Sequence, residues 1–171
     1  MLTADMERTA EISECGKYRW WLRRRWQEGK SVCFVMLNPS TADATQDDPT
    51  IRRCIDFAQR WGFAALEVLN LFPYRTTYPK EMRAASMRGV DIRGGERGAL
   101  ELVGAQRCDL IVAAWGKYPC SSRASQFLEL TAPSPIYCLA KNGDGSPVHP
   151  LYQNANQRPT AFARCQGTYF P

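Results

Sequence analysis

The sequence predicts a single α/β domain over residues 1–171, a three-layer α/β/α sandwich built on a parallel sheet of about four strands. Three observations lead to this fold class. Four short apolar runs have the composition of strands that are buried on both faces, as parallel strands are. The chain between successive runs is long enough for the crossover connections that parallel strands require. Amphipathic helical patterns lie in those intervals, which gives the order βαβαβαβ.

The predicted strands are bounded by polar or turn-forming residues. The first run is followed by Asn38-Pro39, and the third is followed by Gly116. Runs this short are typical of strands rather than of buried helices. The four predicted strands are Val32–Leu37, Leu66–Leu71, Asp109–Trp115 and Pro135–Ala140.

The clearest helix is predicted between the first two strands. Asp48 is placed to cap its amino end, Pro49 takes the first helical position, and Gly62 ends it. Its apolar face is formed by Ile51, Cys54, Ile55, Ala58 and Trp61.

Two further helices are predicted over residues 95–107 and 122–130. In the first of them we expect Leu100, Val103 and Gly104 to face the core. Residues 76–95 and the tail from residue 141 show no regular pattern, and we expect them to be functional or covering loops.

The composition excludes several classes of protein. Apolar residues make up 44% and charged residues 23%, as in ordinary globular domains, and no apolar run approaches the roughly 20 residues that cross a bilayer. The start of the chain lacks the pattern of a secretory signal. We therefore expect a soluble, cytoplasmic protein with no membrane contact.

The cysteines do not predict a metal site. The seven cysteines are scattered without a CxxC pair, and the chain has one histidine. We expect no metal and no cofactor, with Cys33, Cys54 and Cys138 acting as reduced packing residues.

The net charge of +5 is mild, but arginines gather locally. The cluster of Arg23, Arg24, Arg25 and Lys30 is compatible with phosphate contacts and equally with a solvated face. Beside the loops discussed below, the expected phosphate or nucleic-acid contacts are Arg52, Arg53, Arg75 and Lys117.

Ligands of an open parallel sheet bind outside the carboxyl ends of the strands. Asn38 follows the first strand, where an amide can hold a water or a ligand carbonyl, although turns use the same residue types. For Asp48 we favour the helix cap. We expect Asn38, Asn70, Trp115 and His149 to converge on one pocket, with Pro39, Ser40 and Gly116 beside them as ligand-binding residues.

His149 is the only histidine, and it lies in a loop after the fourth strand. A lone histidine is more often a surface or core residue than a catalyst. Here Pro147 and Pro150 stiffen the loop, so we expect the imidazole to be presented rather than buried.

Most of the chain resembles a bacterial and phage family, domain of unknown function 1643. The resemblance rests on MLNPSTADATQDDPTIRRC (residues 36–54) and on the later motifs WGF, NLFPYRTTYP, AAWG and PVHPLY. This family name implies no activity.

A more distant resemblance is to the uracil-DNA glycosylase superfamily, in its mismatch-specific branch. That branch has a G-[IL]-N-P-G motif after an apolar strand, where this chain has FVMLNPS (residues 34–40), and the late His149-Pro150 is similar to its H-P-S motif. Leu37 and Ser40 stand in place of the flanking glycines, and Leu151 stands in place of the serine.

The resemblance implies a role for each matched residue. Asn38 would position the attacking water, and His149 would donate a hydrogen bond to the departing base as negative charge develops. Asn70 would contact the base edge, and the target base would be extruded from a duplex.

Three functions remain open from the sequence. The first is an enzyme that hydrolyses an N-glycosidic bond of a base, modified or not, in DNA or in a nucleotide. The second is a nucleic-acid or nucleotide binding module without catalysis on the same fold. The third is a small-molecule transferase or hydrolase on the same scaffold. The oligomeric state is not predicted.

Overall fold

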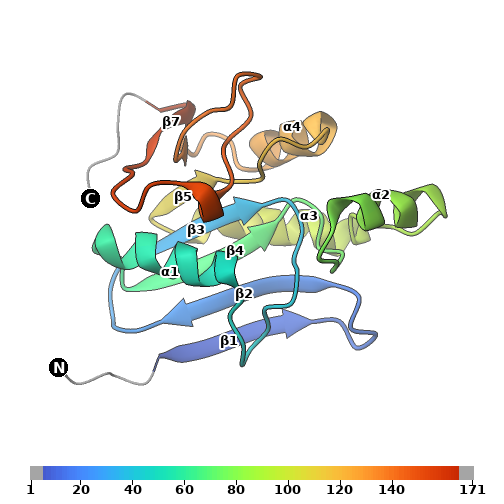
Figure 1. Cartoon of the computed structure of the whole chain (residues 1–171), viewed down its shortest axis with the longest axis horizontal. Helices are drawn as coiled ribbons and strands as arrows, with labels where there is room; N and C mark the ends of the chain where they lie inside the picture. Colours follow the sequence, from blue (N-terminus) through green and yellow to red (C-terminus); the bar gives the residue numbers. More distant parts are fainter. Residues whose placement is uncertain (1–5, 166–171) are drawn as a thin grey trace.

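In the computed structural model, which describes residues 6–165, a mixed sheet of seven strands has helices on both faces (Figure 1). The four predicted runs are all strands of this sheet. They are β3 (Ser31–Met36), β4 (Ala65–Asn70), β5 (Leu110–Ala113) and β6 (Ile136–Cys138). Neighbours among them pair in parallel, in the order β4-β3-β5-β6.

The prediction of about four strands, all parallel, is wrong for the sheet as a whole because it omits three antiparallel strands. These are β1 (Glu7–Ile12) and β2 (Arg19–Arg25), which extend the sheet beyond β4, and β7 (Thr160–Ala163), which pairs with β6. The first two lack a continuous apolar run, since they read ERTAEI and RWWLRRR. Their hydrogen bonds to neighbours, rather than apolar burial, define them as strands.

Side chains alternate across the central strand and build two cores. Val32, Phe34 and Met36 of β3 face the layer of α1 (Pro49–Arg60), where Phe34 stacks on Trp61 with ring centroids 5.8 Å apart. Val35 points to the opposite face. Helices α2 (Pro79–Met87), α3 (Gly95–Val103) and α4 (Ser121–Leu130) cover that face.

Helix α1 begins and ends where the sequence predicts. The Asp48 carboxylate accepts a hydrogen bond from the Ile51 backbone N–H at 2.9 Å, and Pro49 is the first helical residue. Gly62 follows the helix with φ +81°, a backbone conformation that favours glycine. The amino end of α1 is therefore fixed beside the end of β3.

Two details of the other helices differ from the prediction. Residues 79–87, which we expected to lie in an irregular loop, form α2. The helix from Gly95 continues as a 3-10 turn, η1 (Gly104–Arg107), as far as predicted, but Leu100 is 71% exposed and Leu102 is buried instead. Helix α3 buries Gly98 and Leu102, and Gly104 is buried at the start of η1 as predicted.

All seven cysteines are free, and Cys33, Cys54 and Cys138 are buried in the cores. No helix within residues 6–165 has the length and apolar character to cross a bilayer.

Candidate functional site

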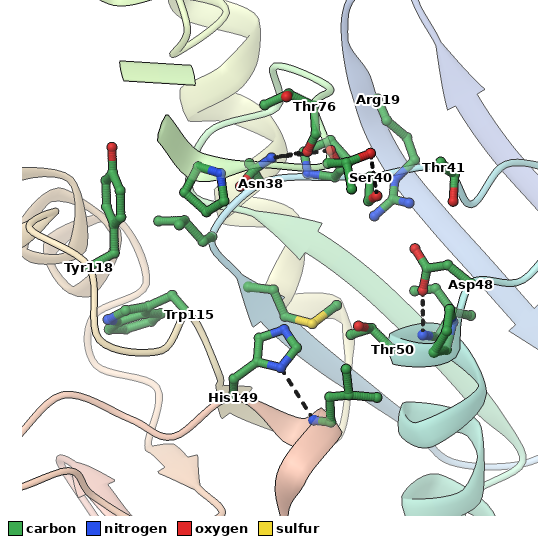
Figure 2. A pocket seen from close by; sticks show the side chains of 18 of the residues that line it. Arg19, Asn38, Ser40, Thr41, Asp48, Thr50, Thr76, Trp115, Tyr118 and His149 are labelled. Atoms are coloured by element: carbon green, nitrogen blue, oxygen red, sulfur yellow. Dashed lines mark hydrogen bonds between the residues drawn. The ribbon is translucent and has the colours of Figure 1, made fainter. Parts of the chain in front are cut away.

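A pocket of about 590 Å³ opens at the carboxyl end of the parallel strands (Figure 2). The chain leaves β3 for β4 on one side and returns to β5 on the other, so the order of strands reverses between β3 and β5. Ligands of open α/β sheets bind at such a point. The loops that follow β3, β4, β5 and β6 all contribute to the pocket lining, together with Arg19 of β2.

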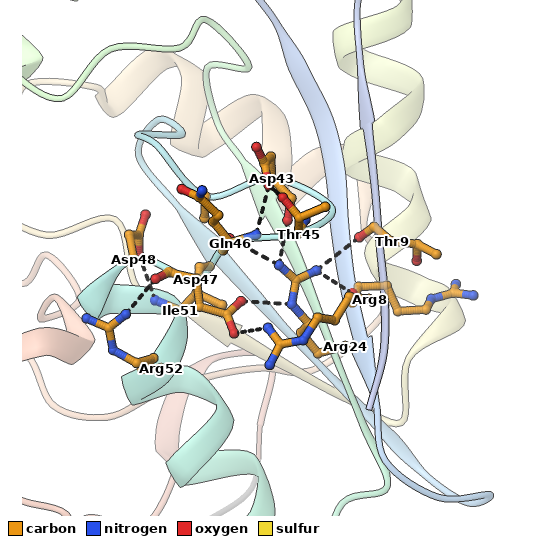
Figure 3. A network of polar contacts seen from close by, with 12 residues as sticks. Arg8, Thr9, Arg24, Asp43, Thr45, Gln46, Asp47, Asp48, Ile51 and Arg52 are labelled. Carbon is orange, nitrogen blue, oxygen red and sulfur yellow. Dashed lines mark hydrogen bonds and ion pairs between the residues drawn. The ribbon is translucent and has the colours of Figure 1, made fainter. Parts of the chain in front are cut away.

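The loop between β3 and α1 forms one wall, and the buried Arg24 of β2 holds it in place (Figure 3). The Arg24 side chain is fully buried and donates a 2.8 Å hydrogen bond to Asp47, and it also donates to the backbone carbonyls of Asp43 and Gln46. Asp47 in turn pairs with Arg8 of β1. The interpretation of this arginine cluster as a solvated face is wrong for Arg24, because its charge is directed inward to organise the loop.

Asn38 is fixed by its own amide group. Its Nδ2 donates to the backbone carbonyls of Pro39 at 3.2 Å and Thr76 at 2.7 Å. Both partners are acceptors, so they determine which end of the amide is the NH₂ group. The Oδ1 atom has no hydrogen-bond partner among residues 6–165, and it is the group left to orient a water or a ligand donor.

His149 has a defined tautomer for a similar reason. The Leu151 backbone N–H donates to Nδ1 at 3.3 Å, at the start of the 3-10 turn η2 (Pro150–Tyr152). In the neutral ring the proton therefore lies on Nε2. Burial lowers the pKa of His149, although the Asp48 carboxylate partly opposes this shift. At neutral pH the half-buried ring is an uncharged hydrogen-bond donor in the pocket lining (Figure 2).

The loop that carries His149 is hydrogen-bonded to the segments that follow β5 and β6. Gly116 donates its N–H to the Pro147 carbonyl at 3.0 Å, and Val148 donates to the Ala140 carbonyl at 3.0 Å. Gly116 has φ +76°, and a Cβ atom there would lie 3.6 Å from the His149 Cβ. Gly116 therefore lies directly beside His149, with room for a Cβ atom at ordinary contact distance.

Aromatic side chains form the wall that follows β5. Trp115 is 5% exposed and packs edge-on against Phe127 and Phe162. Tyr118 lies beyond it, and Tyr152, 84% exposed, stands at the mouth 6.5 Å from the His149 ring. A pocket of this size with aromatic walls and a few fixed polar groups suits a ligand as large as a nucleobase with its sugar.

Six of the predicted site residues line this one pocket, and five do not. The six are Asn38, Pro39, Ser40, Trp115, Lys117 and His149. The five that lie outside its lining are Asn70, Gly116, Arg52, Arg53 and Arg75.

The predicted residues outside the pocket are engaged with other parts of the protein. Asn70 is buried, and its Oδ1 accepts a hydrogen bond from Arg19 at 3.1 Å. Arg52 donates to the Asp47 carbonyl, Arg53 to the Gln153 carbonyl, and Arg75 to the Gly16 carbonyl. Each of these groups is held on a neighbouring element rather than on the pocket wall, which corrects the prediction that Asn70 reaches the pocket.

Two charged residues of the pocket were missed by the sequence prediction. Arg19 lines the inner wall, and the strand that carries it was not predicted. Asp48 was predicted as a helix cap, which it is, but it also faces the pocket (Figure 2). Arg19 could be found only by recognising that RWWLRRR pairs as a strand of the sheet. The segment lacks a continuous apolar run, so the pattern of apolar residues does not predict this pairing.

Among residues 6–165 there is no group of three or more histidine, cysteine or acidic side chains arranged to hold a metal ion. The polar groups of the pocket are amide, imidazole, hydroxyl, carboxylate, guanidinium and ammonium. They suit hydrogen bonding and charge stabilisation.

A family model described as a protein of unknown function, DUF1643, matches residues 19–151. No curated protein and no solved structure matches the chain significantly. The matched range contains every residue of the pocket lining except Tyr152.

Proposed function

We propose that this chain, which belongs to the DUF1643 family of proteins of unknown function, hydrolyses the N-glycosidic bond of a base in DNA or in a nucleotide. One observation carries the proposal: Asn38 and an uncharged His149 line the same pocket at the strand-order reversal, each with one polar group unused. The chain would have a fold related to that of the uracil-DNA glycosylase superfamily.

His149 would act on the leaving base. As the bond to the sugar breaks, negative charge develops on the base, and the Nε2–H group would donate to a base carbonyl. A donor fixed beforehand stabilises this charge without reorganisation, and the low dielectric of the site strengthens the bond.

Asn38 would act on the water. Its Oδ1 atom is held by two hydrogen bonds on the other end of the amide, so a water bonded to it approaches from a fixed direction. Such positioning lowers the entropic part of the barrier. The water oxygen bonds to the anomeric carbon as the bond to the base breaks. One proton of the water passes to solvent, and the departing base anion takes up a proton from solvent to become the free base.

The substrate base would differ from uracil. Leu37, Ser40 and Leu151 are the positions at which this chain departs from the glycosylase motifs, and all three line the pocket. Larger or differently shaped residues at the binding surface change the ligand while the scaffold stays the same. A modified base is therefore the favoured substrate.

The test is a screen of the purified protein against single- and double-stranded oligonucleotides with varied modified bases, and against free nucleotides. Abasic sites and free base are measured after incubation. We expect release of one class of base, and loss of that release in Asn38→Ala. No release from any of these substrates would refute the proposal.

A second candidate, a binding module without catalysis, is favoured by one observation. The Asn38 amide does not accept a proton at neutral pH, and the Asp48 carboxylate of the lining is engaged as the cap of α1, where it accepts from the Ile51 N–H. A binding module would retain the ligand without base release. Substituting alanine for Lys117 at the mouth, or for Arg52 or Arg53, would lower its affinity for the ligand. The binding would weaken with salt, as phosphate contacts do.

Asp48→Asn tests whether the pocket stabilises a cationic sugar. Asparagine caps helices as well as aspartate does, so the substitution removes the charge and keeps the cap. A nearby carboxylate stabilises the sugar cation, so we expect base release to slow by roughly 10 to 100-fold. The rate is measured in single turnovers. Asp56→Asn is the matched control, because Asp56 pairs with Arg60 outside the pocket lining; equal rates in both variants would contradict this role.

A further inference from the structure

Arg19 is a buried cation without a carboxylate partner. Its side chain belongs to β2, is 2% exposed, and lines the inner wall of the pocket. No carboxylate of residues 6–165 lies within 4.0 Å of its guanidinium. A charge that is buried unpaired is costly, so an arginine in this position calls for a compensating group.

The protein satisfies only part of the guanidinium. Nη1 donates to the Ala42 carbonyl and Nη2 to the Asn70 Oδ1, each at 3.1 Å, and both acceptors are neutral. Within the described part of the chain, the Nε–H group has no hydrogen-bond partner, and neither does the buried Nδ2 of Asn70. Two of the five N–H groups of Arg19 are thus bonded to the protein. Asn70, which does not reach the pocket, holds Arg19 in place.

The surroundings of Arg19 favour an anion. Burial lowers the pKa of Arg19 to about 10, a shift that Asp48 opposes and that the charges of Arg75 and Arg24 increase, so the group stays protonated at neutral pH. The hydroxyl groups of Ser40, Thr41 and Thr50 belong to the same lining, and the guanidinium points toward the pocket beside Ser40 and Thr41, whereas Thr50 lies farther from it (Figure 2). The lining carries two cationic side chains, Arg19 and Lys117, against the single carboxylate of Asp48.

We propose that Arg19 and the neighbouring hydroxyls form a phosphate subsite, so that the ligand of this pocket is a nucleotide whose phosphate lies on the inner wall. The planar guanidinium matches two phosphate oxygens, and hydroxyl donors complete the shell of a tetrahedral anion. The proposal rests on the proposed function for the identity of the rest of the ligand. A free mononucleotide supplies a terminal phosphate that enters the pocket whole, whereas DNA supplies a phosphodiester that remains linked to a chain.

Binding is measured by titration calorimetry with nucleoside 5′-monophosphates, the matching nucleosides, inorganic phosphate and a short oligonucleotide. We expect the monophosphates to bind about 10 to 100-fold more tightly than the nucleosides, as a charge-assisted pair predicts. Inorganic phosphate is expected to compete with the monophosphates. Tighter binding of the oligonucleotide than of the monophosphate would overturn the assignment to a free nucleotide.

Two variants of the subsite are expected to abolish the preference for monophosphates by different routes. Arg19→Gln removes the charge, and we expect it to abolish the preference for monophosphates. Asn70→Asp places a carboxylate against Arg19 without changing the shape of the side chain, so the charge of the guanidinium is compensated by the protein itself. We expect it to raise the melting temperature and also to abolish the preference. This second variant keeps the test decisive if Arg19→Gln fails to fold.

Arg123→Gln is the matched control. Arg123 is 1% exposed and donates to the carbonyls of Leu71 and Arg93, away from the pocket lining. It should lose stability and retain the preference for monophosphates. A wild-type protein without that preference, or a preference that survives in Asn70→Asp, would overturn the proposal. Phosphate binding through Arg19 without base release would instead refute the proposed function and leave the subsite standing.

Discussion

His149→Ala is expected to slow base release by about 100 to 1,000-fold while the affinity for the ligand stays nearly unchanged. The imidazole would act mainly in the transition state, where negative charge on the departing base strengthens its hydrogen bond to Nε2–H. An interaction made only there lowers the rate when it is removed but not the ground-state binding. The rate is measured in single turnovers and the affinity by calorimetry.

His149→Gln serves as the control, because its side-chain amide still offers an N–H donor to the pocket. We expect it to recover part of the lost rate. If alanine and glutamine variants both bind and release base as the wild type does, His149 has no role in the reaction.

The stability of the protein is expected to depend on pH through the protonation of His149. Protonation places a hydrogen on Nδ1, which then faces the Leu151 N–H instead of accepting from it. Burial lowers the folded pKa below the unfolded value of 6.5, so the unfolded chain binds the proton more readily. Stability is therefore retained above pH 6.5 and lost as the pH falls through that value toward the folded pKa. A nuclear magnetic resonance titration of the only imidazole checks the direction of this shift.

Arg24→Ala is expected to destabilise the protein by about 3 to 5 kcal/mol, the usual range when one partner of a buried ion pair is removed. The substitution removes four hydrogen bonds that join β2 to β1 and to the loop over residues 43–47, and a fifth to the Arg23 carbonyl within β2. It also leaves Asp47 with Arg8 as its remaining partner. The free energy of unfolding is measured by urea denaturation.

The neighbouring Arg25→Ala is the matched control on the same strand. Arg25 pairs with Glu28, whose side chain is 97% exposed, and such surface pairs contribute less than about 1 kcal/mol. The two variants should differ clearly in stability. Equal losses would mean that Arg24 does not organise the loop that carries Asn38.

The central parallel strands could be predicted because burial on both faces leaves a continuous apolar run, as in VCFVML over residues 32–37. The strands at the edges could not, because their stability comes from pairing with neighbours that are distant in sequence. In β2 the buried positions include Arg19 and Arg24, whose hydrogen-bond partners Asn70 and Asp47 are distant in sequence and come near only in the folded structure. The pattern of apolar residues along the sequence does not predict such contacts.

The same distinction holds for the site. Asn38, Trp115 and His149 follow predicted strands, and the rule that strand ends share one edge brings them to one pocket. Asn70 is the last residue of β4, yet the longer side chain of Arg19 lines the pocket and Asn70 accepts a hydrogen bond from it. The position of a residue in the sequence therefore predicts its edge of the sheet, but not which of two neighbouring side chains meets the ligand.

The proposed reaction is tested most directly by single-turnover release of free base from the best substrate of the screen, compared between wild type and Asn38→Ala at saturating protein. Wild type is expected to release the base, and Asn38→Ala to bind the same substrate with similar affinity while releasing it about 100 to 1,000-fold more slowly. Equal rates of release in the two proteins, or binding by the wild type with no release at all, would contradict hydrolysis at this pocket.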